Sequence, residues 1–346
     1  MTVTDNLGPG GAVHRHLIGV AYRLLGSVHD AEDAVQDALE RWSALPEQGD
    51  VREPVAWLTT VVSRLSVDRL RSARARRESY AGIWLPEPVL GDAVAPRGAG
   101  RAAAPEDVVT LDKSVSFALL TAMEQLTPAE RTALILHDVF ALTFVEVAAI
   151  LDRTPEACRQ LATSARRHLR GRPRFAVDGP ERDRAVRAFA DACRTGDVDA
   201  LTRVLAPDVI TRSDGGGHVH AARRAVVGAE QVARFLLGVL GGQARHGRSP
   251  EVAFEPVNGR RGLVLREDGA ITAVVDVAVA AGLVAEIAIV LNPDKLPSGT
   301  AASKSGPPPP ARFRIRDGPA PTRRRSRRPA PGRARRAWRA RGPRGS

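Results

Sequence analysis

Side chains that can bind nucleic acid are concentrated between Arg153 and Arg170, in the sequence RTPEACRQLATSARRHLR. At helical spacing one face of this stretch is apolar, whereas the other presents Glu156, Arg159, Gln160, Thr163, Arg166, Arg167 and Arg170. Arginine and glutamine can make paired hydrogen bonds with guanine and adenine in the major groove, and arginine also binds phosphate. For a helix by itself a solvated charged face is the simpler explanation, so the neighbouring elements must decide between the two interpretations.

The elements before this stretch favour DNA binding. Thr154 can cap a helix that begins at Pro155, and two residues separate that cap from a helix in LTFVEVAAILD, where Thr143 and Glu146 form a capping box. A third capped helix begins after Thr127 in LTPAERTALILHDVF. Short helices joined by so tight a turn are typical of a helix-turn-helix, whose second helix enters the major groove, although the usual turn glycine is missing.

Two further helices, one acidic and one basic, are expected near the N-terminus. In DAEDAVQDALERW an apolar face opposes a polar face made by Asp30, Asp33, Gln36, Asp37 and Glu40. An acidic face repels DNA, so it is either solvated or meets a basic protein surface. The next helix, over residues 55–78, is predicted to bury Val55, Leu58, Val61, Val62 and Leu65. It is predicted to expose arginines that bind DNA, among them Arg64, Arg69 and Arg71. Trp57 is predicted to be a core residue rather than a base-stacking one.

These segments resemble regions two and four of a bacterial extracytoplasmic-function sigma factor, over residues 12–171. The resemblance implies that residues 12–80 bind core RNA polymerase and the −10 promoter element, and that residues 106–171 bind the −35 element. The acidic face would dock on the clamp helices of the polymerase β′ subunit, and the loop from Leu45 to Pro54 would receive a base flipped out of the −10 element. In the helix that begins at Pro155, the reading helix, Arg167 and Arg170 would contact phosphate, and the bases would be contacted by Arg159, Gln160, Thr163 and Arg166.

Beyond Arg172 the sequence predicts a domain that contains strands as well as helices. Three helices, within residues 181–209 and 228–240, accompany four strand candidates, EVAFEPV, RGLVLRE, AITAVVDVAV and VAEIAIVLN. Helices followed by an antiparallel sheet fit an α+β cone with a cavity, and residues 180–297 resemble the SnoaL-like branch of the NTF2-like fold. The expected fold class is therefore multidomain: two all-α sigma modules, an α+β SnoaL-like domain and a disordered tail over residues 298–346.

Three short motifs resemble those of the sigma-factor subgroup that carries a SnoaL-like domain. WLPEP, in a linker over residues 81–105, consists of Trp84, Leu85, Pro86, Glu87 and Pro88. The other two lie in the C-terminal domain and contribute Asp214, Gly215, Gly216 and Gly217 from DGGGH and Asn292, Pro293, Asp294, Lys295 and Leu296 from NPDKL. The subgroup that these motifs resemble usually has a lysine where this chain has His218.

The large apolar pair in WLPEP leads us to expect that the C-terminal domain docks on the linker through the other two motifs. Packing of WLPEP against its own module is an alternative. DGGG can also be a turn without a binding role, and NPDKL can be the capped end of a strand.

Other functions stay open from the sequence alone. A SnoaL-like enzyme fused to a DNA-binding regulator would need an acid or base in its cavity, for which Asp208, Asp214 and Asp276 are available, but no His–Asp pair can be assigned from spacing. A plain helix-turn-helix repressor leaves the acidic helix unexplained. The sigma-factor resemblance implies no catalysis, no cofactor and no metal, with core polymerase and promoter DNA as partners, and the cavity could hold a small-molecule ligand.

The charge of the chain is unevenly distributed. The whole chain carries +12, whereas residues 301–346 contain 14 arginines, one lysine and one aspartate and therefore carry +14, which leaves −2 for residues 1–300. The tail either adds non-specific phosphate affinity or is a translation artefact. Cys158 and Cys193 have no metal-binding spacing, and Cys158 is predicted to be a small core residue. We expect a cytoplasmic protein without a membrane partner, because no stretch is apolar enough for a span or a signal peptide.

Overall fold

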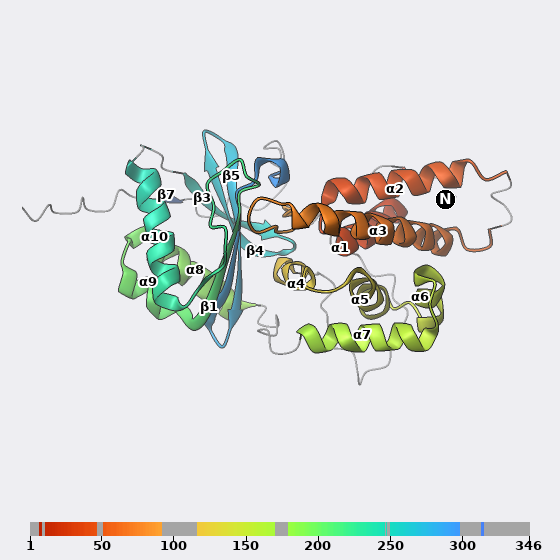
Figure 1. Cartoon of the computed structure of the whole chain (residues 1–346). Coiled ribbons are helices and arrows are strands. Elements are labelled where there is room, and N and C mark those ends of the chain that lie inside the picture. Colours follow the sequence, from red (N-terminus) through yellow and green to blue (C-terminus); the bar gives the residue numbers. More distant parts are fainter. Residues whose placement is uncertain are drawn as a thin grey trace, which may run out of the picture.

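The computed structural model describes residues 7–8, 11–46, 51–91, 116–169, 179–245, 247, 250–297 and 313–314. A helical half formed by the residues before 170 lies beside a C-terminal domain of helices and one sheet (Figure 1). Arg170 lies outside the described residues, as do residues 47–50 of the expected base-binding loop, residues 92–115 and, apart from 313–314, the tail from residue 298.

Three helices form the first module: α1 (Ala12–Leu25), α2 (Val28–Ser43) and α3 (Pro54–Glu78). Gly26 ends α1 in the left-handed region, at φ 72°, and Ser27 caps α2 by accepting a hydrogen bond from the Asp30 amide. The predicted apolar face of α2 is buried. The prediction for Val55 is wrong, because this residue lies in the first turn of α3 and is 36% exposed. Trp57 is half-buried and packs on Trp42, with ring centroids 5.5 Å apart.

The second module contains α4 (Phe117–Met123), α5 (Pro128–Leu134), α6 (Phe144–Leu151) and α7 (Pro155–Leu169), and α5 continues as a π-helical turn over Ile135–Val139. Both predicted capping boxes, Thr127 with Glu130 and Thr143 with Glu146, are present. Asp152 takes the left-handed conformation, at φ 53°, in the turn between α6 and α7. Aspartate tolerates this region better than most residues, which explains how the turn forms without glycine.

The C-terminal domain contains α8 (Pro180–Thr195), α9 (Val198–Val204), α10 (Ala229–Arg245) and a sheet in the order β2-β1-β6-β5-β4-β3-β7. Its strands are β1 (Leu205–Asp214), β2 (Val226–Val227), β3 (Glu251–Val257), β4 (Arg260–Glu267), β5 (Ala270–Ala280), β6 (Leu283–Val290) and β7 (Phe313–Arg314). Two predictions are wrong here. Residues 205–209 begin a strand rather than ending a helix, and the sheet is mixed rather than antiparallel, because β1 pairs with β6 in parallel.

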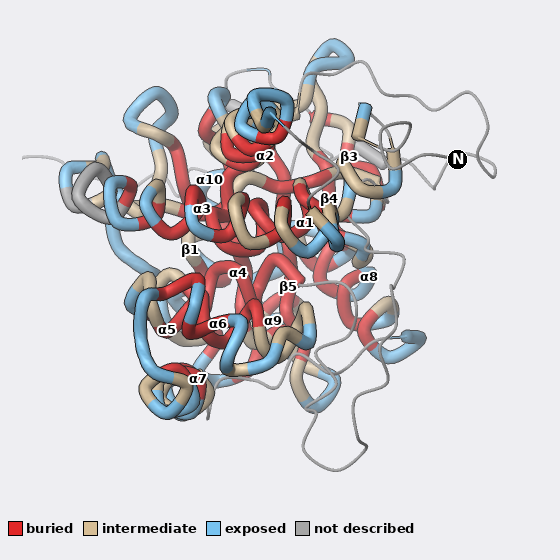
Figure 2. Tube along the Cα trace, turned by 90° about the vertical axis from the view of Figure 1, so that its right-hand side faces the viewer, coloured by how far each residue is buried: buried red, intermediate tan, exposed pale blue. Residues whose placement is uncertain are grey.

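The sheet is covered on both faces. Its helical face packs on α8, α9 and α10 around a core that includes Phe189, Val232, Val277 and Ile287, and its other face looks toward the helical half (Figure 1). On that second face Ala288 and Val290 pack against Leu85 and Phe117. Figure 2 shows the resulting concentration of buried segments where α1, α4 and β5 lie in the middle of the molecule. Burial of both faces explains the nearly continuous apolar run in β5.

Candidate functional site

The parallel pairing of β1 with β6 brings two of the sequence motifs together. Asp214 ends β1 and pairs in register with Val290, the last residue of β6. Parallel strands end at the same edge of a sheet, so DGGGH after β1 and NPDKL after β6 lie next to each other. The Asp214 carbonyl accepts hydrogen bonds from the amides of Leu291 and Asn292, at 2.7 and 2.9 Å, which fixes this placement.

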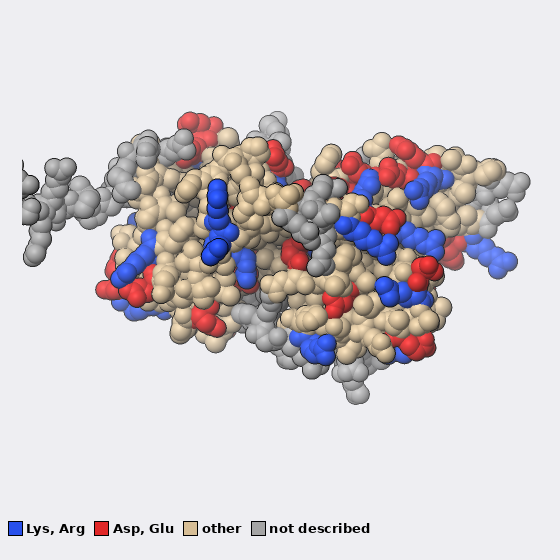
Figure 3. Space-filling model, viewed as in Figure 1, with Lys and Arg blue, Asp and Glu red and all other residues tan. Residues whose placement is uncertain are grey.

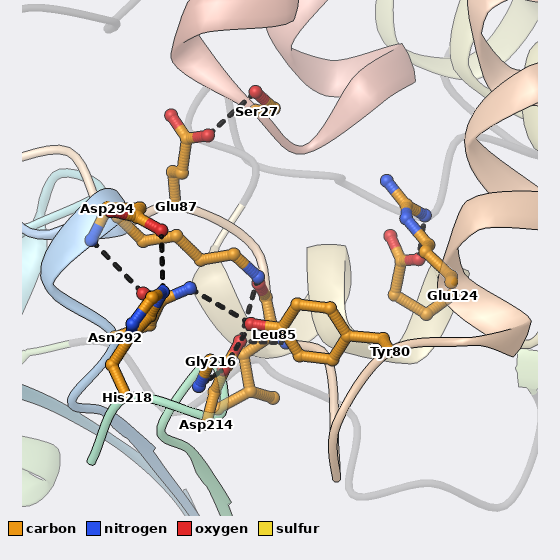
Figure 4. A network of polar contacts seen from close by, with 12 residues as sticks. Ser27, Tyr80, Leu85, Glu87, Glu124, Asp214, Gly216, His218, Asn292 and Asp294 are labelled. Atoms are coloured by element: carbon orange, nitrogen blue, oxygen red, sulfur yellow. Dashed lines mark hydrogen bonds and ion pairs between the residues drawn. The ribbon is translucent and has the colours of Figure 1, made fainter.

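The Asp214 carboxylate is the centre of a polar network between the C-terminal domain and the linker (Figure 4). Its side chain is fully buried. Oδ1 accepts hydrogen bonds from the Tyr80 hydroxyl at 2.6 Å and the Gly216 amide at 3.0 Å. Oδ2 accepts from the Leu85 amide at 2.8 Å and from Nζ of Lys295 at 2.8 Å. Four donors from both sides of the junction therefore converge on one buried carboxylate.

Lys295 of NPDKL joins the same network to the linker. Its ammonium also donates to the Leu85 carbonyl, at 2.7 Å, and lies 4.1 Å from the centroid of the Trp84 ring. On Trp84 the guanidinium of Arg77, from the end of α3, lies 3.5 Å from the ring centroid. Burial lowers the pKa of Lys295, and the neighbouring Asp214 carboxylate opposes this shift. Trp84 thus contacts a cation from each side of the junction.

The glycines of DGGGH allow the close approach of NPDKL. Gly216 has φ 65°, and a Cβ at this position would lie 2.3 Å from the side chain of Asn292. The Asn292 side chain donates to the Tyr80 hydroxyl at 3.0 Å and accepts from the Asp294 amide at 3.1 Å. A turn alone would explain the backbone angle but not the contact, so both the turn and the binding interpretation of DGGG describe part of what the structure shows.

The remaining residues of the three motifs differ in their environment. Leu85, Pro86, Pro88, Gly215 and Asn292 are buried, whereas Gly217, Pro293 and Asp294 are exposed and Leu296 is half-buried. His218 pairs with Asp294 at 3.1 Å, and both side chains are more than half exposed. Glu87 points away from the C-terminal domain and accepts hydrogen bonds from the start of α2. WLPEP therefore contacts its own module and the C-terminal domain together, so the two interpretations of this motif are not exclusive.

A second contact of the C-terminal domain was missed by sequence reasoning. Asn258 lies in the two-residue Asn-Gly turn between β3 and β4, is 7% exposed and donates to the Tyr22 hydroxyl at 2.7 Å. Its side chain accepts from the Val89 amide at 3.1 Å, and its amide donates to the Val89 carbonyl at 2.8 Å. The Asn-Gly pair between two strand candidates indicates a hairpin in the sequence. Nothing local indicates that the hairpin turn is buried against α1.

The predicted reading helix, α7, presents most of its polar face to solvent. Cys158, Ala162 and Ala165 are buried, as predicted, while Arg159, Gln160, Thr163 and Arg167 are exposed. Arg159 lies 5.2 Å from the Phe144 ring centroid. Arg166 is half-buried because its Nε donates to Asp138 at 2.9 Å, so one predicted DNA contact is bonded within its own module.

The acidic face of α2 lies on the surface, with acidic and basic side chains interleaved over the first module (Figure 3). Gln36 donates to Glu40 at 3.1 Å, and both residues are exposed, whereas Asp30 and Asp33 are half-buried. Asp37 is bonded to Arg69 of α3 at 2.9 Å. Arg71 is exposed and lies 3.5 Å from Asp68. Asp37, a predicted polymerase contact, and Arg69, a predicted DNA contact, are therefore bonded to each other.

The second module is held against the first by arginines. Arg64 of α3 donates to the carbonyl of Ala149, in the last turn of α6, at 2.7 Å. Arg77 of α3 forms an ion pair with Glu124, which follows α4, and donates to the Leu25 carbonyl at 2.9 Å. Arg131 of α5 is almost fully buried and forms an ion pair with the same carboxylate. The expected DNA-binding residue Arg64 therefore contacts the other module.

The acidic residues considered for an enzyme cavity have other partners or positions. Asp208 is exposed on β1, and Asp214 faces the linker. Asp276 of β5 lies beside Arg182 of α8 in a buried ion pair, with Nη2 3.4 Å from Oδ1. Burial raises the pKa of Asp276, and Arg182 opposes this shift.

Comparison with known proteins decides the family. Models of Sigma-70 region 2 and Sigma-70, region 4 match residues 11–76 and 116–169. ECF RNA polymerase sigma factor SigJ of Mycobacterium tuberculosis is 42% identical over 233 residues, which cover 66% of this chain and 71% of that protein. Probable ECF RNA polymerase sigma factor SigI of the same species is 34% identical over 302 residues, covering 86% and 97%. The chain belongs to the extracytoplasmic-function (ECF) sigma factors.

The likeness of this ECF sigma factor to a solved structure extends through both halves. The crystal structure of M. tuberculosis extracytoplasmic function sigma factor SigJ matches with a TM-score of 0.64 and 35% identity, covering 85% of this chain and 98% of that chain. The sigma modules followed by a helix-and-sheet domain agree with the fold class expected from sequence. Among the helices in the described ranges, none combines the length and apolarity that a bilayer crossing needs.

Proposed function

We propose that this ECF sigma factor binds core RNA polymerase through the acidic face of α2 and reads the −10 and −35 elements with its first and second modules. The exposed side chains of α7 support the second part, since Arg159, Gln160 and Thr163 lie on its solvent-facing side. The position of Asp33 and Asp37 at the surface supports the binding of core polymerase by the acidic face of α2. Charge complementarity at such a surface mainly sets association rate and partner choice.

The two modules contact each other in the structure, whereas the promoter elements that they are proposed to read lie apart on the DNA. The names of the elements place their centres about 25 base pairs apart, which is about 85 Å along B-DNA. In the structure α3 contacts α6 through the bond from Arg64 to the Ala149 carbonyl. We infer that the second module separates from the first when the promoter is bound. The arrangement with the modules in contact is called the closed placement, and the apparent promoter affinity is the intrinsic affinity multiplied by the fraction of molecules that are open.

The C-terminal domain is proposed to stabilise the closed placement by docking on the linker. The observation that carries this proposal is the buried Asp214 carboxylate, which bonds to Tyr80, Leu85 and Lys295 across the junction. The domain also touches the second module, because Phe117 of α4 packs on Val290. Docking therefore constrains both the linker and the module that must move. We do not propose a small-molecule ligand, since the buried aspartates Asp214 and Asp276 are engaged by Lys295 and Arg182.

Run-off transcription with purified core polymerase tests the proposed function. Core with this protein is expected to initiate at defined sites on genomic promoter fragments where core by itself does not. Asp33→Arg with Asp37→Arg should abolish this by reversing the charge of the acidic face. Asp191→Arg with Asp208→Arg, at two exposed aspartates of the C-terminal domain, is the matched control and should retain activity. Equal core binding by the folded double variant and the wild type would reject the assignment of α2.

A further inference from the structure

Glu87 of WLPEP caps the helix that carries the acidic face. Its Oε1 accepts a hydrogen bond from the Ser27 hydroxyl at 2.7 Å, and its Oε2 accepts from the amides of Val28 at 2.7 Å and His29 at 3.4 Å. The Ser27 hydroxyl accepts from the Asp30 amide at 3.1 Å. The first three amides of α2 are therefore bonded either to Glu87 or to Ser27.

The first amides of a helix have no partner within the helix, and a carboxylate placed there also interacts favourably with the helix dipole. Such hydrogen bonds to a charged acceptor are stronger than those between neutral groups. A residue just before a helix usually supplies its cap, as Ser27 does here. Glu87 lies 60 residues further along the chain than Ser27, so part of the capping of α2 depends on where the linker lies.

The main chain of Glu87 is fixed by the first module and, through it, by the C-terminal domain. The Glu87 amide donates to the Gly26 carbonyl at 2.8 Å, and its carbonyl accepts from the Tyr22 hydroxyl at 2.6 Å. The same hydroxyl accepts from Asn258 at 2.7 Å. A continuous series of hydrogen bonds thus runs from the β3–β4 turn through Tyr22 and Glu87 to the start of α2.

We propose that Glu87 is a positioning residue for polymerase binding. By bonding to the Val28 and His29 amides it orders the first turn of α2, and the acidic face begins at Asp30 in that turn. The hydrogen bonds of Glu87 then strengthen binding to core polymerase without touching the polymerase. The inference rests on the proposed function, because it requires the acidic face of α2 to be the polymerase-binding surface.

Glu87→Gln in the full chain tests the proposal. The carboxylate accepts from Ser27 with one oxygen and from Val28 with the other, whereas a glutamine side chain has a donor amide in place of one of these oxygens and so loses one of the two acceptors. We expect the Val28 and His29 amides to exchange hydrogen about tenfold faster and the affinity for purified core to fall about tenfold. Glu230→Gln, which removes an exposed carboxylate from α10, is the matched control and should change neither quantity.

A second variant covers the case in which Glu87→Gln does not fold. Tyr22→Phe retains the buried ring and removes the hydroxyl that joins Asn258 to the Glu87 carbonyl, and it should weaken core binding about fivefold. Faster exchange at Val28 and His29 with unchanged core affinity would overturn the proposal, because Glu87 would then be a cap without influence on binding.

The charge-reversal variant separates failure of this inference from failure of the proposed function. If Asp33→Arg with Asp37→Arg binds core weakly while Glu87→Gln and Tyr22→Phe bind like the wild type, the inference alone is overturned. If the charge-reversal variant also binds like the wild type, the proposed polymerase surface is wrong, and the role of Glu87 with it.

Discussion

Replacing Asp214 by asparagine should undock the C-terminal domain. The substitution preserves shape but leaves the Lys295 ammonium, whose side chain is 8% exposed, without its anionic partner. An asparagine also places a donor toward either Leu85 and Lys295 or Tyr80 and Gly216, where the carboxylate accepts. Breaking a buried ion pair by removing one partner costs about 3 kcal/mol, which corresponds to a roughly hundredfold change in the docking equilibrium.

Hydrogen exchange at the Leu85 amide measures this equilibrium locally. The amide donates to Oδ2 of Asp214, and Leu85 is fully buried, so it exchanges only when the junction opens. Exchange should accelerate about hundredfold in Asp214→Asn. The matched control is Asp208→Asn, the same chemical change at an exposed position of the same strand, and it should exchange like the wild type.

Combining the substitution with Lys295→Met provides the decisive comparison. Replacing both members of a buried pair by groups of similar shape is often nearly neutral, so the double variant should recover much of the protection lost in Asp214→Asn. Unchanged exchange of Leu85 in a folded Asp214→Asn protein would refute the reasoning, because the carboxylate would then contribute nothing to docking.

Three other perturbations test the junction and the closed placement. Arg77→Leu removes the ion pair with Glu124 and should release the second module, which a larger radius of gyration in small-angle scattering would show. Gly216→Ala should accelerate Leu85 exchange more than Gly269→Ala, since both glycines have positive φ but a Cβ at Gly269 meets no atom within 4 Å. Burial and, to a smaller extent, the nearby positive charge of Arg23 lower the pKa of His16 below its ordinary 6.5. The unfolded chain therefore binds more protons just below pH 6.5, so thermal stability should fall as pH drops below 6.5 and fall less in His16→Gln; identical pH profiles would contradict this.

The helices of the sigma modules could be predicted because their signals are local. The capping boxes at Thr127 and Thr143 and the apolar stripe of α7 depend on residues within one or two turns. Strand β3 coincides with the predicted EVAFEPV for the same reason, since alternation and the following Asn-Gly turn are adjacent in sequence. The π-helical turn after α5 has no comparable local signal, and α4 was not predicted.

The arrangement of the site depends on contacts that no local pattern encodes. Residues 205–209 continue the apolar spacing of α9, yet they form part of β1 because a parallel partner, β6, is available about 80 residues later. The resemblance to the sigma-factor subgroup predicts that WLPEP, DGGGH and NPDKL meet. The geometry in which DGGGH and NPDKL meet follows from the parallel pairing of β1 with β6. Tyr22 and Asn258 are 236 residues apart and bond only in the folded protein. Arg64 has the surface position expected of a DNA contact, and its bond to Ala149 follows from how the modules pack.

The distance between α3 and α7 tests most directly whether docking controls the placement of the two modules. Spin labels at the exposed positions of Ala56 and Glu156, in a chain whose native cysteines have been replaced, would report this distance by double electron–electron resonance. We predict one short distance in the free wild-type protein, a second and longer population in Asp214→Asn, and only the long distance in the complex with core polymerase and promoter DNA. A short distance that persists in the promoter complex, or a distribution in Asp214→Asn identical to that of the wild type, would contradict the account.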